Sequence, residues 1–264
     1  MSLLTWIIIF SLLGGVLSVI VASTFLLLPA NVRSRLVPHL VSFAIGSLLG
    51  AAFLGLLPHA LIGQGVEDFH VMFLTVLIGL LGFFLLEKLV LWRHCHSDHC
   101  EAHGPAHSHD ENPEDSKAAG MMVLVGDAMH NFVDGILIAA AFLTDIHLGV
   151  VTALAIAAHE IPQEVGDFVV LLHSGFTRSK ALLYNVLSSL STIVGAMLAY
   201  WWLAGMEEIL PYVLAVAASS FIYIAVADLI PGLHKRTEVS ATIQQMLLII
   251  SGVSIIYLAH STLH

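Results

Sequence analysis

Polar side chains of metal-binding types lie in the middle of two long apolar stretches, 119–143 and 148–173. Imidazole, carboxylate and amide groups together form ligand sets for divalent metal ions. In both stretches they recur at helical spacings, so each set shares one face of a helix. The first face carries Asp127, His130, Asn131 and Asp134. The second face carries His159, Glu160, Gln163, Glu164 and Asp167.

Both stretches are long enough to span a bilayer, which would place these polar groups near the middle of the hydrocarbon. A carboxylate at the centre of a spanning helix costs about 2.5–3.5 kcal/mol on insertion scales. Neither stretch contains a Lys or Arg that could neutralise its acids. The compensating charge must therefore come from protons, water or a bound cation, and the ligand types favour a divalent metal.

The segments HNFVD and HEIPQ each begin with a His and place another donor four residues later. Two such helices packed face to face would surround one ion with the first and last residues of each segment. These four predicted ligands are His130, Asp134, His159 and Gln163. Asn131 and Glu160 could hold a second ion beside the first. Glu164 and Asp167 continue the polar face toward one end of the helix, as expected for a path of passage.

The segments HNFVDG and HEIPQEVGD resemble the paired signature of the ZIP (Zrt/Irt-like) metal transporters. The second segment is closest to the branch of that family whose motif reads HExPHExGD. Gln163 stands where that motif has its second His, and an amide oxygen binds zinc less well than imidazole does. The resemblance covers essentially the whole chain. It implies import of metal toward the cytoplasm, a two-metal site, and a bundle with the fourth and fifth helices inside.

The composition is that of an integral membrane protein, because 58% of the 264 residues are hydrophobic and only 11% are charged. Apolar runs predict eight spanning helices in one transmembrane domain, 1–264, an all-α bundle. Their expected ranges are 4–28, 38–62, 70–92, 119–143, 148–173, 180–203, 209–230 and 242–261. The N-terminal run has no basic region or obvious cleavage site, so we interpret it as the first spanning helix.

The basic residues indicate the orientation, because they occur only around alternate connections between helices. They are Arg33, Arg35, Lys88, Arg93, Lys117, Arg178, Lys180, Lys235 and Arg236. By the positive-inside rule these connections face the cytoplasm, and both termini lie outside it. We expect a multi-pass protein of the cell membrane, with an internal membrane as the alternative.

One long polar segment, at about 93–118, is rich in His and contains both cysteines, Cys95 and Cys100. Such a composition is typical of metal binding, so we interpret it as a cytoplasmic metal-binding or sensing loop. A solvated connector is the alternative. Two cysteines in one loop indicate no disulfide framework.

Two other groups of polar residues each leave two interpretations open. His59, near one end of the second helix, is either a ligand at the mouth of the path or an interfacial side chain. The sixth helix could complete a second metal position or merely bond to its neighbours. Its candidates are Asn185, Ser188, Ser189 and Ser191.

Transport of divalent cations is the function that these observations favour, with Zn²⁺ as the expected substrate and Fe²⁺, Mn²⁺ and Cd²⁺ as alternatives. An intramembrane metal-dependent hydrolase is the competing reading, since HEIPQE begins like the HExxH of zinc proteases. The second His of that motif is replaced by Gln163, and Pro162 interrupts the helical turn. We therefore expect neither an enzyme nor a catalytic cofactor.

The expected partners are metal ions and the lipid bilayer, and a homodimer is left open. Nucleic acid is not an expected partner, because nine basic residues and a net charge of −10 provide no basic patch.

Overall fold

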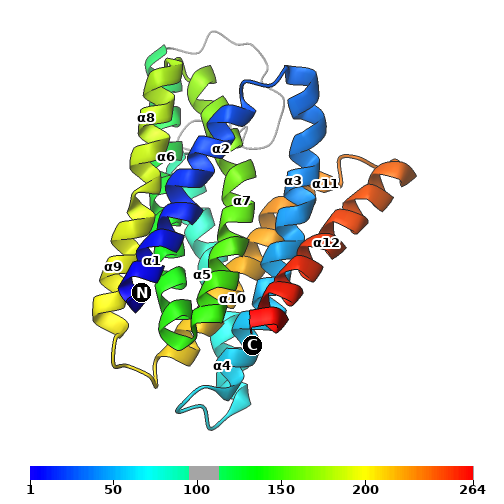
Figure 1. Cartoon of the computed structure of the whole chain (residues 1–264). Helices are drawn as coiled ribbons and strands as arrows, with labels where there is room; N and C mark the ends of the chain where they lie inside the picture. Colours follow the sequence, from blue (N-terminus) through cyan, green and yellow to red (C-terminus); the bar gives the residue numbers. More distant parts are fainter. Residues whose placement is uncertain (95–112, 264) are drawn as a thin grey trace.

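The computed structural model describes residues 1–94 and 113–263, which form a bundle of helices without a β-strand in that part of the chain (Figure 1). The first half contains α1 (Leu3–Leu12), η1 (Leu13–Leu17), α2 (Ser18–Phe25), α3 (Ala30–Gly50), η2 (Ala51–Leu56), α4 (Leu57–Ile62) and α5 (Phe69–His94). The second half contains α6 (Pro113–Thr144), α7 (Ile146–His173), α8 (Arg178–Ser189), α9 (Ser191–Leu203), α10 (Leu210–Tyr223), η3 (Ile224–Leu229), α11 (Ile230–Leu233) and α12 (Val239–Leu263). Most of the His-rich segment predicted at about 93–118 lies outside the described residues.

Seven helices in the described ranges are long and apolar enough to cross a membrane. They are Leu3–Phe25, Ala30–Ile62, Phe69–Leu89, Ser116–Thr144, Arg178–Leu203, Leu210–Leu233 and Val239–Thr262. The all-α membrane protein predicted from the sequence is therefore confirmed. The remaining expected span corresponds to α7, which is 28 residues long but carries the polar face that lowers its hydropathy.

Two of the spans contain a short π-helical segment just before a proline. Segment η2 precedes Pro58, and segment η3 precedes Pro231. A proline has no N–H for the carbonyl four residues earlier, and its ring crowds that carbonyl. The wider π turn lets the chain continue as one span through each of these positions.

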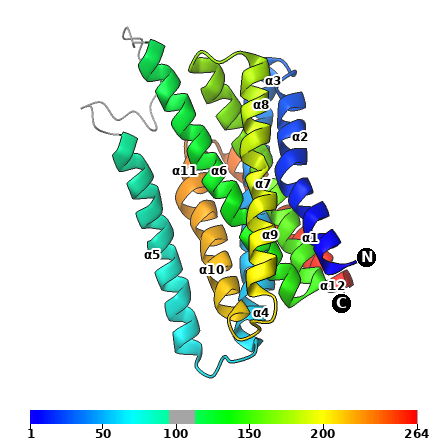
Figure 2. The same ribbon diagram turned by 90° about the vertical axis from the view of Figure 1, so that its left-hand side faces the viewer.

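Helix α6 lies directly against α9, and small residues permit this close approach (Figure 2). A Cβ atom on Gly135 of α6 would lie 1.9 Å from the carbonyl oxygen of Thr192. A Cβ atom on Gly195 of α9 would lie 2.1 Å from the carbonyl oxygen of Phe132. Glycine is thus required at both positions, since backbones this close leave no room for a side chain.

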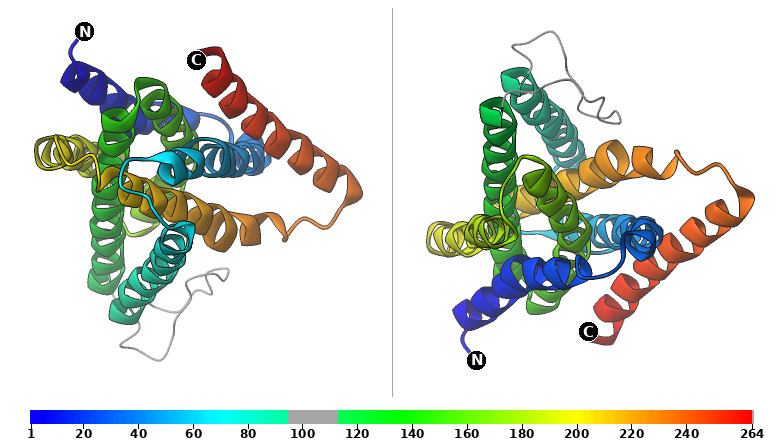
Figure 3. Two further views of the ribbon diagram at one scale, coloured as in Figure 1. Left: turned by 90° about the horizontal axis from the view of Figure 1, so that it is seen from below. Right: turned by 90° about the horizontal axis from the view of Figure 1, so that it is seen from above.

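Helix α7 packs against α6 and also contacts α1, α2, α3, α8 and α12. The view along the bundle shows α5 and α12 at its periphery, where α5 packs on α10 and α12 packs on α3 (Figure 3). The N-terminal half of α7 is buried in the main hydrophobic core, together with residues of α6 and α10. The polar second half of α7 therefore meets α6 inside protein rather than at its surface.

Candidate metal centre

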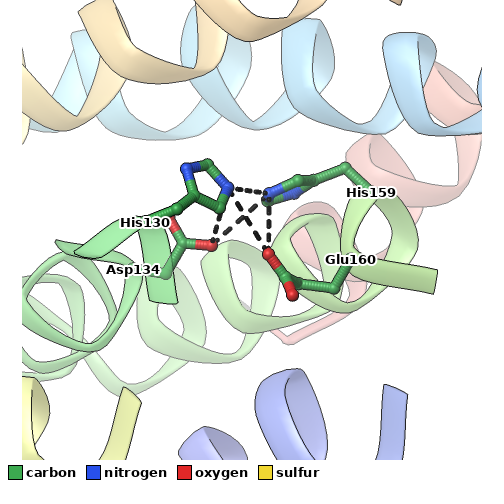
Figure 4. Close-up of side chains that lie close together, drawn as sticks. All are labelled: His130, Asp134, His159 and Glu160. Carbon is green, nitrogen blue, oxygen red and sulfur yellow. Dashed lines mark hydrogen bonds and ion pairs between the residues drawn. The ribbon is translucent and has the colours of Figure 1, made fainter. Parts of the chain in front are cut away.

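Four side chains from α6 and α7 point toward one another (Figure 4). They are His130 and Asp134 from α6 and His159 and Glu160 from α7. The Nε2 atoms of the two histidines are 3.2 Å apart. Asp134 Oδ2 lies 3.4 Å from His159 Nε2 and 3.8 Å from His130 Nε2. Glu160 Oε1 lies 3.4 Å from His130 Nε2 and 3.5 Å from His159 Nε2.

These separations match those around a tetrahedral zinc ion. Ligand atoms at 2.0–2.1 Å from zinc at the corners of a tetrahedron are about 3.3–3.4 Å apart. The five separations given above span 3.2–3.8 Å. Two imidazole nitrogens and two carboxylate oxygens are therefore close enough together that they could hold one such ion.

The four donors, which we call the first group, lie in a buried and poorly hydrogen-bonded environment. Asp134, His159 and Glu160 are each at most 1% exposed. Both carboxylate oxygens of Asp134 and of Glu160 are buried and have no hydrogen-bond partner among the described residues. A buried carboxylate is stable only when it is protonated or when positive charge compensates it. A divalent cation at this position would supply that charge and use the oxygens as ligands.

The backbone of α7 orients His159 for metal binding. Nδ1 of His159 lies 3.2 Å from the carbonyl oxygen of Ala155, one turn earlier on the same helix. A carbonyl oxygen only accepts hydrogen bonds, so Nδ1 carries the proton, and in the neutral imidazole Nε2 has the lone pair. This lone pair points toward the other three donors, as is usual for a metal-binding histidine whose second nitrogen is held by a carbonyl.

A second group of donors lies beside the first. Oxygens of Asp127, Glu160 and Glu164 lie within 4.8 Å of one another, and all three residues are buried. Glu160 belongs to both groups and so connects them. Asp127 lies on the polar face recognised in the sequence but was not among the predicted ligands, although its place one turn before His130 was the available signal.

A chain of hydrogen bonds from α8 and α9 holds Asp127 in place. Thr192 donates to Asn131 Oδ1 at 2.8 Å, and Asn131 Nδ2 donates to Asp127 Oδ1 at 2.9 Å. Ser188 donates to the other carboxylate oxygen of Asp127. Both ends of the Asn131 amide are therefore engaged. The sequence predicted Asn131 as a ligand of a second ion, whereas in this structure it positions Asp127.

The candidates on α8 and α9 differ in their surroundings. Ser189 and Ser191 donate to backbone carbonyls, which favours their role in helix packing. Asn185 is completely buried, and neither atom of its amide has a hydrogen-bond partner within the described ranges. Of the four candidates, only Ser188 contacts the second group directly.

The sequence placed Gln163 as the fourth donor of the first ion, and Glu160 beside a second ion. In the structure Glu160 occupies the fourth position, whereas Gln163 is half-buried and makes no hydrogen bond to the four. Glu164 belongs to the second group, and Asp167 is half-buried one turn beyond Gln163. Glu160 and Gln163 are three positions apart on α7 and point in directions about 60° apart, so the crossing of α6 and α7 decides which of them meets His130.

Comparisons with known proteins identify relatives along most of the chain. The profile of the family described as ZIP zinc transporter matches residues 91–260. Zinc transporter ZIP13 of Pongo abelii is 33% identical over 232 residues, which cover 83% of this chain and 66% of that protein. Zinc transporter ZIP13 of Gallus gallus is 31% identical, covering 89% of this chain and 77% of its own length. Zinc transporter ZIP10 of Homo sapiens is 39% identical over 53% of this chain and 17% of that protein.

The chain thus spans about two thirds of the length of the first of these relatives. The match covers α6 and α7 and therefore includes both groups of donors. Together with the apolar helices, it identifies a multi-pass membrane protein. The chain belongs to the ZIP zinc transporter family.

Proposed function

We propose that the protein transports divalent metal ions, and Zn²⁺ in particular, through the two groups of donors between α6 and α7. The observation that carries this proposal is the arrangement of two imidazoles and two carboxylates at the spacing of a tetrahedral zinc shell. Family membership supports it, because the relatives bear the name zinc transporter.

The transporter in this proposal is a single membrane domain of eight spanning helices, with α6 and α7 at the centre. Helix α7 is long enough to cross the hydrocarbon, and its polar face meets α6 inside the bundle. All nine Lys and Arg residues lie in or beside segments at one end of the bundle. By the positive-inside rule that end faces the cytoplasm, so both chain termini face away from it.

The surroundings of the first group support movement of metal toward the cytoplasmic end. On the N-terminal side of His159, α7 is packed with fully buried apolar residues, including Leu148, Val151 and Ile156. These residues close the path from the opposite side. On the C-terminal side of His159 lie the second group and then Asp167. This arrangement supports a path that is closed on the outer side of His159 and continues through further donors toward the cytoplasm.

The two groups differ in ligand chemistry, so the affinity for zinc decreases from the first group to the second. Zinc binds strongly to mixed nitrogen and oxygen ligands, whereas an all-carboxylate set also suits harder ions. An ion that passes from the first group to the second exchanges imidazole for oxygen donors and is held less tightly. Gln163, one turn after His159, is retained in this proposal as an additional oxygen ligand. Fe²⁺, Mn²⁺ and Cd²⁺ are the expected competitors.

No observation favours a hydrolase, because the residue at the second His position of HExxH is Gln163. Flux of zinc into liposomes that contain only the purified protein tests the transport proposal. We expect uptake by the natural sequence and by Glu238→Ala. Glu238 is an exposed acid just before α12 that belongs to neither group of donors, so this variant is the control. We expect loss of most uptake by Asp134→Ala, which removes one of the four donors. Equal uptake by the two variants would refute the assignment of the site.

A further inference from the structure

A second set of histidines gathers at the end of the bundle that carries both termini, the lower end in Figure 1. His59 is in the last turn of α4, and His260 is in the last turn of α12. Asp145 and His147 lie where α6 ends and α7 begins. We call these four residues the outer cluster. Helix α12 contacts both η2 and α7, so three distant segments of the chain meet here.

The outer cluster consists of two close pairs of side chains. The rings of His59 and His260 lie edge to face, with their centroids 5.4 Å apart. His147 Nδ1 lies 3.8 Å from Asp145 Oδ1. Burial raises the pKa of Asp145, but the Leu148 N–H bond and the charges of His147 and His59 outweigh it, so this pKa is lowered. Asp145 is therefore an anion. The other three members of the cluster are imidazoles, so the four side chains together can attract and bind a cation.

One histidine of the cluster is held in a form that binds metals. Nδ1 of His59 lies 2.9 Å from the carbonyl oxygen of Gly55, one turn earlier. Because a carbonyl only accepts, Nδ1 carries the proton in the neutral imidazole, and Nε2 then has the lone pair that a metal requires. The same arrangement orients His159 in the first group. All four cluster residues are half-buried, and Nδ1 of His147 and of His260 are shielded from solvent.

The charge around the outer cluster favours cations. The connections at this end contain five acids and no Lys or Arg. The acids are Glu67, Asp68, Asp145, Glu207 and Glu208. The connections that hold four of them adjoin, since a Cβ atom on Gly65 would lie 3.4 Å from Glu208 Cβ. A surface with charge of one sign raises the local concentration of the opposite ion and its rate of association.

We propose that His59, Asp145, His147 and His260 form a capture site for a zinc-like divalent cation at the outer mouth of the transport path. This inference rests on the proposed transport function. Three imidazoles and one carboxylate favour Zn²⁺ over Mg²⁺ and Ca²⁺, which prefer oxygen ligands. Among the described residues, three or more donor atoms within 4.8 Å of one another occur in the first and second groups but not in the outer cluster, so this cluster holds the ion more weakly. Weak binding suits a site that must pass its ion onward.

The outer cluster is separate from the first group. His147 and His159 are twelve residues apart on α7, which corresponds to about 18 Å along a helix. Fully buried apolar residues such as Val151 and Ile156 fill the space along α7 between them. An ion at the outer cluster therefore waits outside the closed path, and the two sites can be tested independently.

Residue-resolved labelling of the full-length natural protein tests for the site directly. Diethyl pyrocarbonate modifies unprotonated histidine, and mass spectrometry of peptides quantifies each position. We expect added Zn²⁺ to reduce labelling of His59, His147 and His260, and Mg²⁺ to leave it unchanged. His70, an exposed histidine on α5, is the matched control and should be labelled equally in both conditions. Equal labelling of His59 and His260 with and without Zn²⁺ would overturn the proposal.

Uptake kinetics separate this inference from the transport function. The double variant His59→Asn, His260→Asn should raise the half-saturation concentration for zinc by about tenfold, the lower limit of the gain that local enrichment of an ion gives, with the maximal rate retained. His70→Asn should leave both parameters unchanged. If zinc uptake persists but labelling shows no protection, only the capture site fails. If protection occurs without uptake, the transport function fails and the binding site stands.

Discussion

The substitution Gly135→Ala tests whether the close contact between α6 and α9 positions the metal site. Gly135 directly follows Asp134, one of the four donors of the first group. Its added Cβ would lie 1.9 Å from the Thr192 carbonyl oxygen and 2.8 Å from the Ala196 backbone nitrogen. Carbon atoms of this kind are essentially never closer than 3.0 Å to such neighbours, so the two backbones must separate by about 1.1 Å.

Two costs follow from this separation. Overpacking at a rigid contact destabilises a protein by about 1–3 kcal/mol. Thr192 also donates at 2.8 Å to Asn131, and a shift of this size breaks the bond and leaves a buried amide oxygen unpaired, at about 1–3 kcal/mol. We therefore expect Gly135→Ala to lower the free energy of unfolding by roughly 2–6 kcal/mol. Zinc binding should also weaken. The donors on α6 and α7 are 3.2–3.8 Å apart, and a displacement of α6 by about 1.1 Å would disturb these distances.

Gly126→Ala is the matched control, because Gly126 is on the same helix and a Cβ there meets nothing within 4 Å. We expect its free energy of unfolding to change by less than about 1 kcal/mol, and its zinc binding to be normal. Denaturant titration in detergent micelles measures the first quantity, and equilibrium dialysis with zinc measures the second. If Gly135→Ala unfolds and binds zinc like Gly126→Ala, the contact does not support the site and the reasoning is wrong.

Three further predictions concern the site and the His-rich segment. Gln163→His should lower the half-saturation concentration for zinc with an unchanged or reduced maximal rate, because imidazole binds zinc more strongly than an amide does; an unchanged affinity in dialysis would exclude Gln163 from the path. Thr192→Val should reduce zinc binding less than Asp127→Asn does, since it removes only the support of Asn131 while Asp127 keeps its charge; the reverse order would contradict the positioning role. Deletion of about 94–112 should leave basal uptake in liposomes largely intact, and complete loss of uptake by a folded variant would refute this.

The sequence was sufficient to predict the apolar spanning helices and the family, because both depend on local pattern. Apolar runs of bilayer length predict spanning helices, and all seven helices found apolar enough to span were among those expected. The helical repeat places His130 and Asp134 on one face, because positions four apart project in nearly the same direction. The resemblance of HNFVDG and HEIPQEVGD to the ZIP signature is likewise local, and comparison with known proteins confirmed that family.

Only the tertiary structure decided which donors meet. The crossing of α6 and α7 brings Glu160, rather than Gln163, against both histidines, and a repeat along one helix contains no information about the angle between two. The role of Asn131 depends on Thr192, 61 residues away on α9, and the outer cluster joins His59 to His260 across most of the chain. Such contacts arise from packing between distant segments, whereas periodicity specifies only the face that each helix presents.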